Sequence, residues 1–162
     1  MASSKTKIGI LLMAVFILAG AAGGFFLAYH QHTANPVLPR SAWNNAGYKD
    51  PVSTIKTMAW AANNKDATTL YASLSPDCQE WLKQMVEKRM PGAPPEQFLS
   101  QMWSKQLNGR SGIRVVKTEP MPGDKLLMDI ALEGGKQEGD HWIGMRKVEG
   151  EWKFDDFNPK GK

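Results

Sequence analysis

The sequence predicts an α+β domain in which several helices precede an antiparallel sheet of about four strands. Three observations lead to this prediction. Apolar residues recur at intervals of three and four between residues 51 and 107, which is typical of amphipathic helices. They alternate with polar residues between residues 113 and 157, which is typical of strands. An uncharged run of 22 residues near the N-terminus predicts a transmembrane helix ahead of the domain.

Four helices are expected before the sheet. Asp50 and Pro51 open the first, because a capping side chain followed by Pro at the first helical position is a common helix start. Pro76 opens the third helix in the same way, and Pro91 ends it. The second and fourth helices are expected at residues 67–74 and 96–107, and Asn108-Gly109 ends the fourth.

The last two strands carry the clearest turn signal. Glu149 and Gly150 separate two alternating runs, and a two-residue loop with Gly second favours a tight hairpin. Earlier strands are expected at residues 113–118 and 126–132, separated by Pro and Gly. Opposed residues share a face of a sheet, so the turn predicts the register. The expected pairs are Val148 with Glu151, Lys147 with Trp152, Arg146 with Lys153, Met145 with Phe154, and Ile143 with Asp156.

Residues 8–29 are long enough to cross a bilayer as a helix. A cleaved secretory signal is the alternative, but the apolar run continues through Phe25 and Phe26 beyond the small residues where cleavage would occur. Lys5 and Lys7 precede the run, so we expect a single-pass protein with a cytoplasmic N-terminus. The C-terminal domain is then extracytoplasmic, in the periplasm or at the cell surface.

The expected organisation has four parts. Residues 1–7 form a cytoplasmic stub, residues 8–29 the membrane anchor or uncleaved signal, residues 30–49 a linker, and residues 50–159 the domain. The linker prediction depends on a lack of periodicity and on Asn-Pro and Leu-Pro pairs. Trp43 and Tyr48 in this segment are expected either at the lipid interface or against the domain.

Composition excludes several functions. The formal net charge of +4 gives no basis for nucleic-acid binding. Cys78 is the only cysteine, so no internal disulfide forms, and an isolated cysteine on a helix is typically a small buried apolar residue. His30 and His32 alternate in the linker without a further ligand nearby, so we predict no metal site. No cofactor-binding or phosphate-binding motif is recognisable, and no cofactor is expected.

The order of elements resembles the nuclear-transport-factor-2-like superfamily over about residues 50–157. The resemblance depends on the Pro-initiated helix, the Asn-Lys-Asp break at residues 64–66 and the Val-Glu-Gly-Glu-Trp-Lys tail. It is nearest to small bacterial, membrane-anchored extracytoplasmic members of unassigned function. The resemblance implies a strongly curved sheet wrapped around helices into a cone with a pocket at its mouth. No catalytic motif of the family's isomerases and cyclases can be matched, so no catalytic residue is predicted.

Candidate binding residues belong to two places. The expected register makes His141 and Asp156 diagonal neighbours, which is a potential acid–base pair beside a pocket or, alternatively, a solvated pair at its rim. Trp60 and Tyr71 are candidates for the pocket wall, as are Trp81, Trp103 and Trp152, but core packing is the preferred interpretation for most of these aromatic residues. Trp142 and Phe157 are candidates for an apolar contact on the outer face of the sheet.

Two functions follow from these predictions. The first is a non-enzymatic binding or assembly module of the cell envelope, with the membrane and a protein partner or second copy as its contacts. The alternative is a small-molecule-binding protein or isomerase-like or cyclase-like enzyme that takes an apolar ligand into the cone. An open cavity of several hundred Å³ with convergent polar groups would favour the second function.

Overall fold

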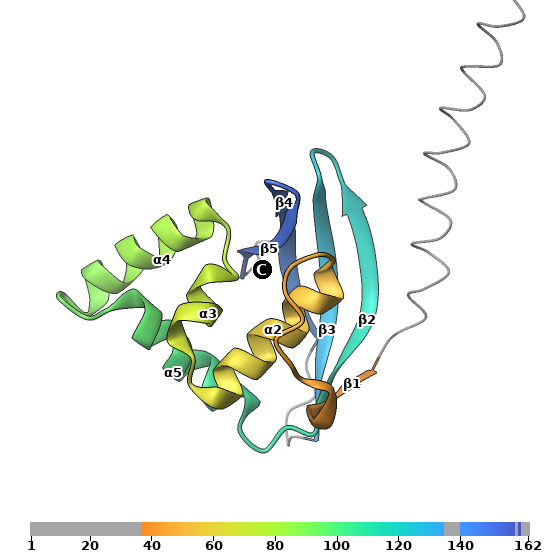
Figure 1. The fold of residues 1–162 in the computed structure, drawn as a ribbon. Helices are drawn as coiled ribbons and strands as arrows, with labels where there is room; N and C mark the ends of the chain where they lie inside the picture. The colour runs from red at the N-terminus through yellow and green to blue at the C-terminus, as the bar shows by residue number, and fades with distance from the viewer. Residues whose placement is uncertain (1–36, 135–139, 158, 160–162) are drawn as a thin grey trace, which may run out of the picture. The chain divides into compact units, whose positions relative to one another are not determined.

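The computed structural model describes residues 37–134, 140–157 and 159. Within these residues, four α-helices lie on one side of a five-stranded antiparallel sheet in the order β1-β2-β3-β4-β5 (Figure 1). The helices are α2 (Pro51–Asn64), α3 (Ala67–Ala72), α4 (Pro76–Arg89) and α5 (Pro95–Leu107). The strands are β1 (Val37–Pro39), β2 (Gly112–Met121), β3 (Lys125–Glu133), β4 (Asp140–Val148) and β5 (Glu151–Asp156).

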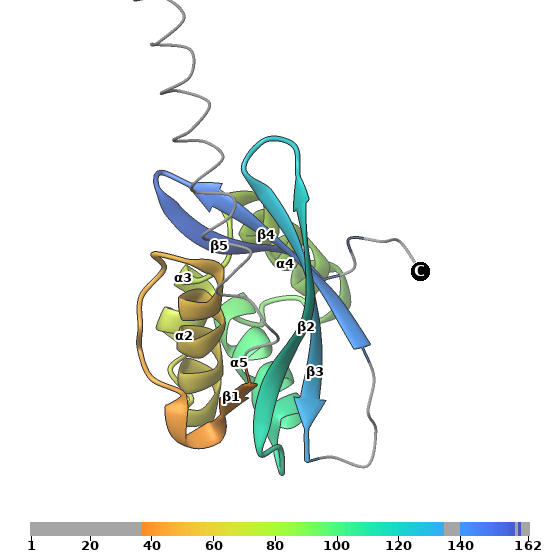
Figure 2. The same cartoon turned by 90° about the vertical axis from the view of Figure 1, so that its right-hand side faces the viewer.

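The predicted α+β class is confirmed, with helices packed on a strongly curled antiparallel sheet. Figure 2 shows β4 and β5 running obliquely across the direction of β2 and β3. The predicted stub, the anchor at residues 8–29 and the first part of the linker lie outside the described residues. Among the residues that the structure describes, no helix is both long and apolar enough to cross a membrane.

The helix starts follow from side-chain caps. The Asp50 carboxylate accepts a hydrogen bond of 2.7 Å from the Ser53 backbone N–H, and Pro51 occupies the first helical position of α2. Ser75 caps α4 in the same way through the Cys78 N–H at 3.2 Å. Both predicted starts are confirmed. These caps satisfy backbone donors that would otherwise lack partners.

The hairpin between β4 and β5 is confirmed over its first four pairs, from Val148 with Glu151 to Met145 with Phe154. Glu149 and Gly150 both have positive φ, as the predicted turn requires. The prediction that Ile143 faces Asp156 is wrong.

A β-bulge causes this difference. Asp155 is an additional residue on β5, so Asp156 pairs with Gly144 instead of Ile143. A Cβ atom at Gly144 would lie only 3.0 Å from the Asp156 Cβ, so glycine permits this close approach. One inserted residue moves every later side chain of the strand to the opposite face of the sheet. Phe157 therefore lies on the helix-covered side.

Residues 37–49, expected to be part of the linker, contact the domain. Leu38 pairs with Ile113 as β1 joins the edge of β2, and a 3-10 helix, η1 (Arg40–Ala42), follows. Trp43 is buried and its indole N–H donates to the Leu38 carbonyl at 3.1 Å. Trp43 and Tyr48 were expected either at the lipid interface or against the domain, and both lie against the domain.

Backbone groups from the helical layer cover the outer edge of β5. The Phe154 N–H donates to the Ser73 carbonyl at 2.9 Å, and the Phe154 carbonyl accepts from Ser75 at 2.7 Å. The Trp152 N–H donates to the Tyr48 carbonyl at 2.7 Å. An uncovered edge can pair with a strand of another chain. Since these bonds occupy the edge of β5, strand addition at this part of the sheet is blocked.

Candidate functional site

A cavity of about 650 Å³ lies between α4, α5 and the curled sheet. Most of its wall is apolar or aromatic. The two helices contribute one wall, with Trp81, Met85 and Arg89 from α4 and Phe98, Met102, Trp103 and Gln106 from α5. The sheet contributes the other wall, with Ile130, His141, Trp142, Ile143 and Phe154, and Phe157 follows the last strand.

A row of four aromatic rings runs along this wall. The ring centroids of Trp81 and Phe157 are 5.5 Å apart, and those of Phe157 and Phe154 are 4.6 Å apart. Trp103 meets Phe154 edge to face at 6.1 Å. These separations and tilts are those at which aromatic pairs attract one another. Trp81 and Phe157 are the solvent-accessible rings of this row, whereas Phe154 and Trp103 are buried.

Three polar side chains reach the cavity from three elements: Arg89 from the last turn of α4, Gln106 from α5 and His141 from β4. All three are exposed to solvent. Among the described residues that line the cavity, none is an aspartate or a glutamate. The charged chemistry that the wall offers is therefore basic.

A second cavity of about 430 Å³ shares Trp81 and Phe157 with the first. It is otherwise lined by Asp77, Cys78, Asp155 and Asp156. Burial, and secondarily the charges of Asp155 and Asp156, raises the pKa of the Cys78 thiol to about 12. The thiolate is the nucleophilic form of cysteine, so Cys78 is not an activated nucleophile at neutral pH. It serves as a buried apolar side chain, as the sequence predicted.

Asp155, the bulged residue, holds α4 against the sheet. Its carboxylate accepts a hydrogen bond of 2.6 Å from the Ser75 hydroxyl and lies 3.1 Å from Arg146 Nε. Arg146 also contacts Asp77 at 2.6 Å. Since Ser75 caps α4 and Asp77 lies in its first turn, this cluster fixes the start of the helix that carries Trp81 and Arg89.

The predicted site residues fall in different places. His141 lines the larger cavity and Asp156 the smaller one, so the structure does not bring them into one cavity. The reason is the bulge, which shifts Asp156 opposite Gly144. Trp60 and Tyr71 line neither cavity. Tyr71 instead approaches the Gln79 carbonyl of α4 with its hydroxyl at 3.5 Å.

The two residues predicted for the outer face of the sheet also lie in different places. Trp142 lies opposite Asp129 in the β3–β4 ladder, and it also borders the larger cavity. Phe157 is not an outer-face residue, because its ring lies against Phe154 and Trp81 on the helix-covered side. The outer-face prediction for Phe157 is corrected accordingly.

The sequence offers Trp81 and Trp103, like Trp60 and Tyr71, as possible cavity residues, but it favours core packing for most of these aromatic side chains. Trp81, Met85, Phe98 and Met102 do share the cavity-facing sides of their helices. Apolar periodicity reports which side of a helix is turned inward, and it carries no information on whether the enclosed volume is filled. Arg89 and Gln106 were missed because each looks like an ordinary exposed helix residue.

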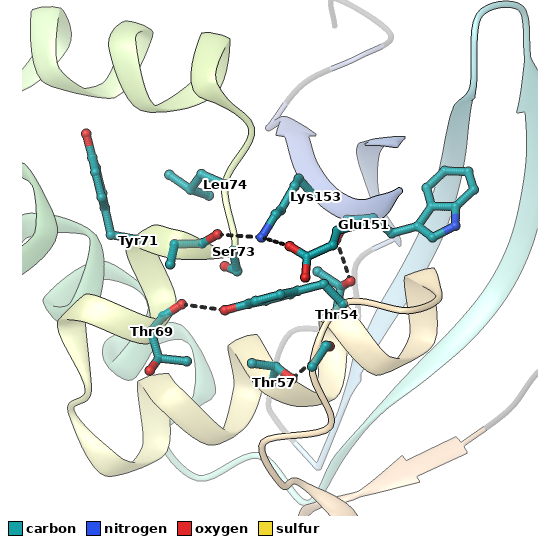
Figure 3. Close-up of polar contacts among 12 residues, drawn as sticks. Thr54, Thr57, Thr69, Tyr71, Ser73, Leu74, Glu151 and Lys153 are labelled. Atoms are coloured by element: carbon teal, nitrogen blue, oxygen red, sulfur yellow. Dashed lines mark hydrogen bonds and ion pairs between the residues drawn. The ribbon is translucent and has the colours of Figure 1, made fainter. Parts of the chain in front are cut away.

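Polar contacts close the outer edge of β5 (Figure 3). The Thr54 hydroxyl donates to the Trp152 carbonyl at 2.8 Å, and the Tyr48 hydroxyl donates to the Thr69 carbonyl at 3.2 Å. Lys153 Nζ lies 3.6 Å from the centroid of the Tyr48 ring and donates to the Ala72 carbonyl at 3.1 Å. We call Tyr48, Thr54, Thr69 and Lys153 the polar network.

Comparisons of the chain with protein-family models, with curated proteins and with solved structures gave no match. The functional assignment therefore depends on the geometry of the site itself.

Proposed function

We propose that this domain binds a small apolar, largely aromatic compound in the larger cavity and does so without chemical conversion. The cavity volume of about 650 Å³ is the observation that carries the proposal. Small-molecule sites in proteins are typically clefts of roughly 300 to 1,000 Å³ with mostly apolar walls and a few polar groups that orient the ligand. Arg89, Gln106 and His141 are such polar groups here.

The arrangement of titratable groups supports binding over catalysis. A general base needs a partner that orients it and a position within hydrogen-bonding reach of the substrate. His141 and Asp156, the pair considered from the sequence, line separate cavities. Burial raises the pKa of Cys78 to about 12, which disfavours a thiolate nucleophile. An isomerase-like or cyclase-like activity therefore has less support than simple binding.

We infer that the domain has the nuclear-transport-factor-2-like architecture. Helices followed by a strongly curled antiparallel sheet, with a cavity between the two layers, support this inference. The 22-residue uncharged run supports the further proposal that the domain is tethered to a membrane and faces the extracytoplasmic side. In that setting the domain would capture a compound in the cell envelope.

A second candidate function is protein assembly, which the exposed apolar residues of α4 favour. Trp81 is 51% exposed and Met90, directly after the helix, is 50% exposed. Exposed apolar surface of this kind marks contact sites in many proteins. However, Trp81 also lines both cavities, so a ligand would cover part of the same surface.

Native mass spectrometry of the full-length protein, gently extracted from its own membrane, tests the binding proposal. We expect a reproducible adduct of a few hundred daltons on the wild type. Met102→Trp, which fills the cavity, should lose the adduct, and Gln101→Trp, an exposed neighbour on α5, should keep it. Phe98→Trp provides a second filling variant if Met102→Trp fails to fold.

Two results would contradict the proposal. An adduct retained equally by both filling variants would place the compound elsewhere. A bare wild-type chain that carries only a second copy or another protein would favour assembly.

A further inference from the structure

Arg89 differs from the other arginines in the described part of the chain. It forms no hydrogen bond or ion pair with the described residues. The other four are held by partners: Arg40 by Asn63, Arg110 by the Gln106 and Leu132 carbonyls, Arg114 by Glu133, and Arg146 by Asp77 and Asp155. Within the described part of the chain, the donors of the guanidinium that lines the cavity are therefore not occupied by a partner.

Among the described residues, no carboxylate compensates the charge of Arg89. The cavity wall contains no carboxylate among its described residues. Glu87, the nearest acidic residue along α4, accepts a hydrogen bond of 3.3 Å from the Gly92 N–H beyond the helix end. Lys88 adds a second positive charge in the same turn of α4. This end of the cavity therefore favours an anion by simple charge complementarity.

The geometry of guanidinium determines which anions fit best. Its planar donors form two parallel hydrogen bonds with carboxylate, sulfonate or phosphate oxygens, and such charge-assisted bonds are roughly twice as strong as neutral ones. Gln106 and His141 line the same cavity from α5 and β4 and offer further donors. At the accessible end of the aromatic row, Trp81 and Phe157 offer apolar aromatic surface to the body of such an anion.

We propose that the ligand of the larger cavity is an aromatic anion, with its aromatic body against Trp81 and Phe157 and its carboxylate, sulfonate or phosphate group on Arg89. This inference rests on the proposed function, because it names the chemical class of compound that the same cavity takes. Neutral and cationic compounds of the same shape would bind more weakly. The discrimination depends on one side chain, which makes it directly testable.

The test compares three probes that differ only in their head group: naphthalene-2-carboxylate, naphthalene-2-methanol and naphthalene-2-methylammonium. Each is titrated by calorimetry into the full-length chain in phosphatidylcholine nanodiscs, with empty nanodiscs as the blank. We expect the carboxylate to bind about tenfold more tightly than the alcohol, and the ammonium compound to bind most weakly.

Variants at α4 assign the preference to Arg89. Arg89→Gln should weaken carboxylate binding about tenfold and alcohol binding less than twofold. Arg89→Lys should recover part of the loss, because it restores the charge without the planar fork. Lys83→Gln is the matched control, since Lys83 is exposed on α4, lies outside the last turn and does not line the cavity, and it should retain the wild-type order.

The possible failures are distinguishable. If the three probes bind equally and Met102→Trp abolishes their binding, the cavity is a ligand site but the anion preference is wrong. If the carboxylate is preferred but Arg89→Gln leaves that preference unchanged, the cavity takes an anion but the assignment of the anionic group to Arg89 is wrong. If no probe binds, or if Met102→Trp leaves all binding intact, both the preference and the proposed function are overturned.

Discussion

β5 has two contact regions that are built differently, its outer edge on one side and its helix-covered face on the other. On one side, the polar network ties α2, α3 and residue Tyr48 to the strand through hydrogen bonds and a cation–π contact. On the other side, α4 and α5 pack on the sheet but leave a cavity of about 650 Å³. We infer that the first side contributes stability and that the second side is available for a ligand.

Phe154 belongs to both sides, and its loss should have the largest effect. Its side chain is fully buried, its ring contacts Trp103 and Phe157, and its backbone pairs with residues 73 and 75. We expect Phe154→Ala to lower the free energy of unfolding by about 3–5 kcal/mol. Urea denaturation followed by circular dichroism measures the change. A loss below about 1 kcal/mol would show that the two sides do not depend on this residue.

Thr54 tests the polar side. Its hydroxyl is fully buried and contacts the Trp152 carbonyl at 2.8 Å, so Thr54→Val keeps the shape but leaves that carbonyl without its partner. The expected loss is about 1–3 kcal/mol in the free energy of unfolding. Thr68→Val, at an exposed position on α3, is the control and should change stability by less than about 0.5 kcal/mol. Equal effects of the two substitutions would refute the role of the network.

Asp66 tests the same side through pH. Its carboxylate caps α3, and the hydrogen bonds from the Thr69 backbone and hydroxyl lower its pKa below the ordinary value of 3.8. Asp66→Ala should cost about 1 kcal/mol at neutral pH.

The pH dependence follows from the direction of this shift. As the pH falls below 3.8, the unfolded chain takes up the proton first, so the advantage of the wild type over Asp66→Ala should decline. Thermal unfolding of both proteins between pH 7 and pH 2.5 measures how their difference in stability changes with pH. A stability difference that is constant with pH would exclude the charged cap as the cause.

Arg89→Gln should have the smallest effect on stability and sets the two sides apart most clearly. Arg89 makes no bond with the described residues, so the variant should unfold within about 0.5 kcal/mol of the wild type. Lys153→Met on the polar side removes contacts to Ala72, Glu151 and the Tyr48 ring and should cost more. Equal losses in parallel urea titrations would remove the distinction between a stabilising side and a binding side.

The sequence was informative wherever local chemistry decides the structure. Asp50-Pro51 and Ser75-Pro76 correctly predicted helix starts, and Glu149-Gly150 correctly predicted a turn and four strand pairs. The register prediction failed at Asp155, because a bulge depends on the close approach that Gly144 permits across the ladder. That one residue moved both Asp156 and Phe157 away from their predicted neighbours.

Features that depend on tertiary packing were not accessible in the same way. The short strand at Val37–Pro39 has no alternating pattern of its own and exists because it pairs with β2. The cavity arises because the large side chains of α4 and α5 meet the sheet without filling the space between them. Periodicity identified the correct faces of both helices, but the volume between two faces depends on their separation.

Methionine methyl groups provide the most direct test of the cavity as a ligand site. Met85 and Met102 line it, whereas Met58 is buried in α2 and Met121 is exposed at the end of β2. The measurement is a titration of the full-length protein, labelled with ¹³C at its methionine methyls, with naphthalene-2-carboxylate. We predict saturable shifts at Met85 and Met102 with Met58 and Met121 unchanged. Unchanged signals at Met85 and Met102, or equal shifts at all four positions, would contradict the proposed site.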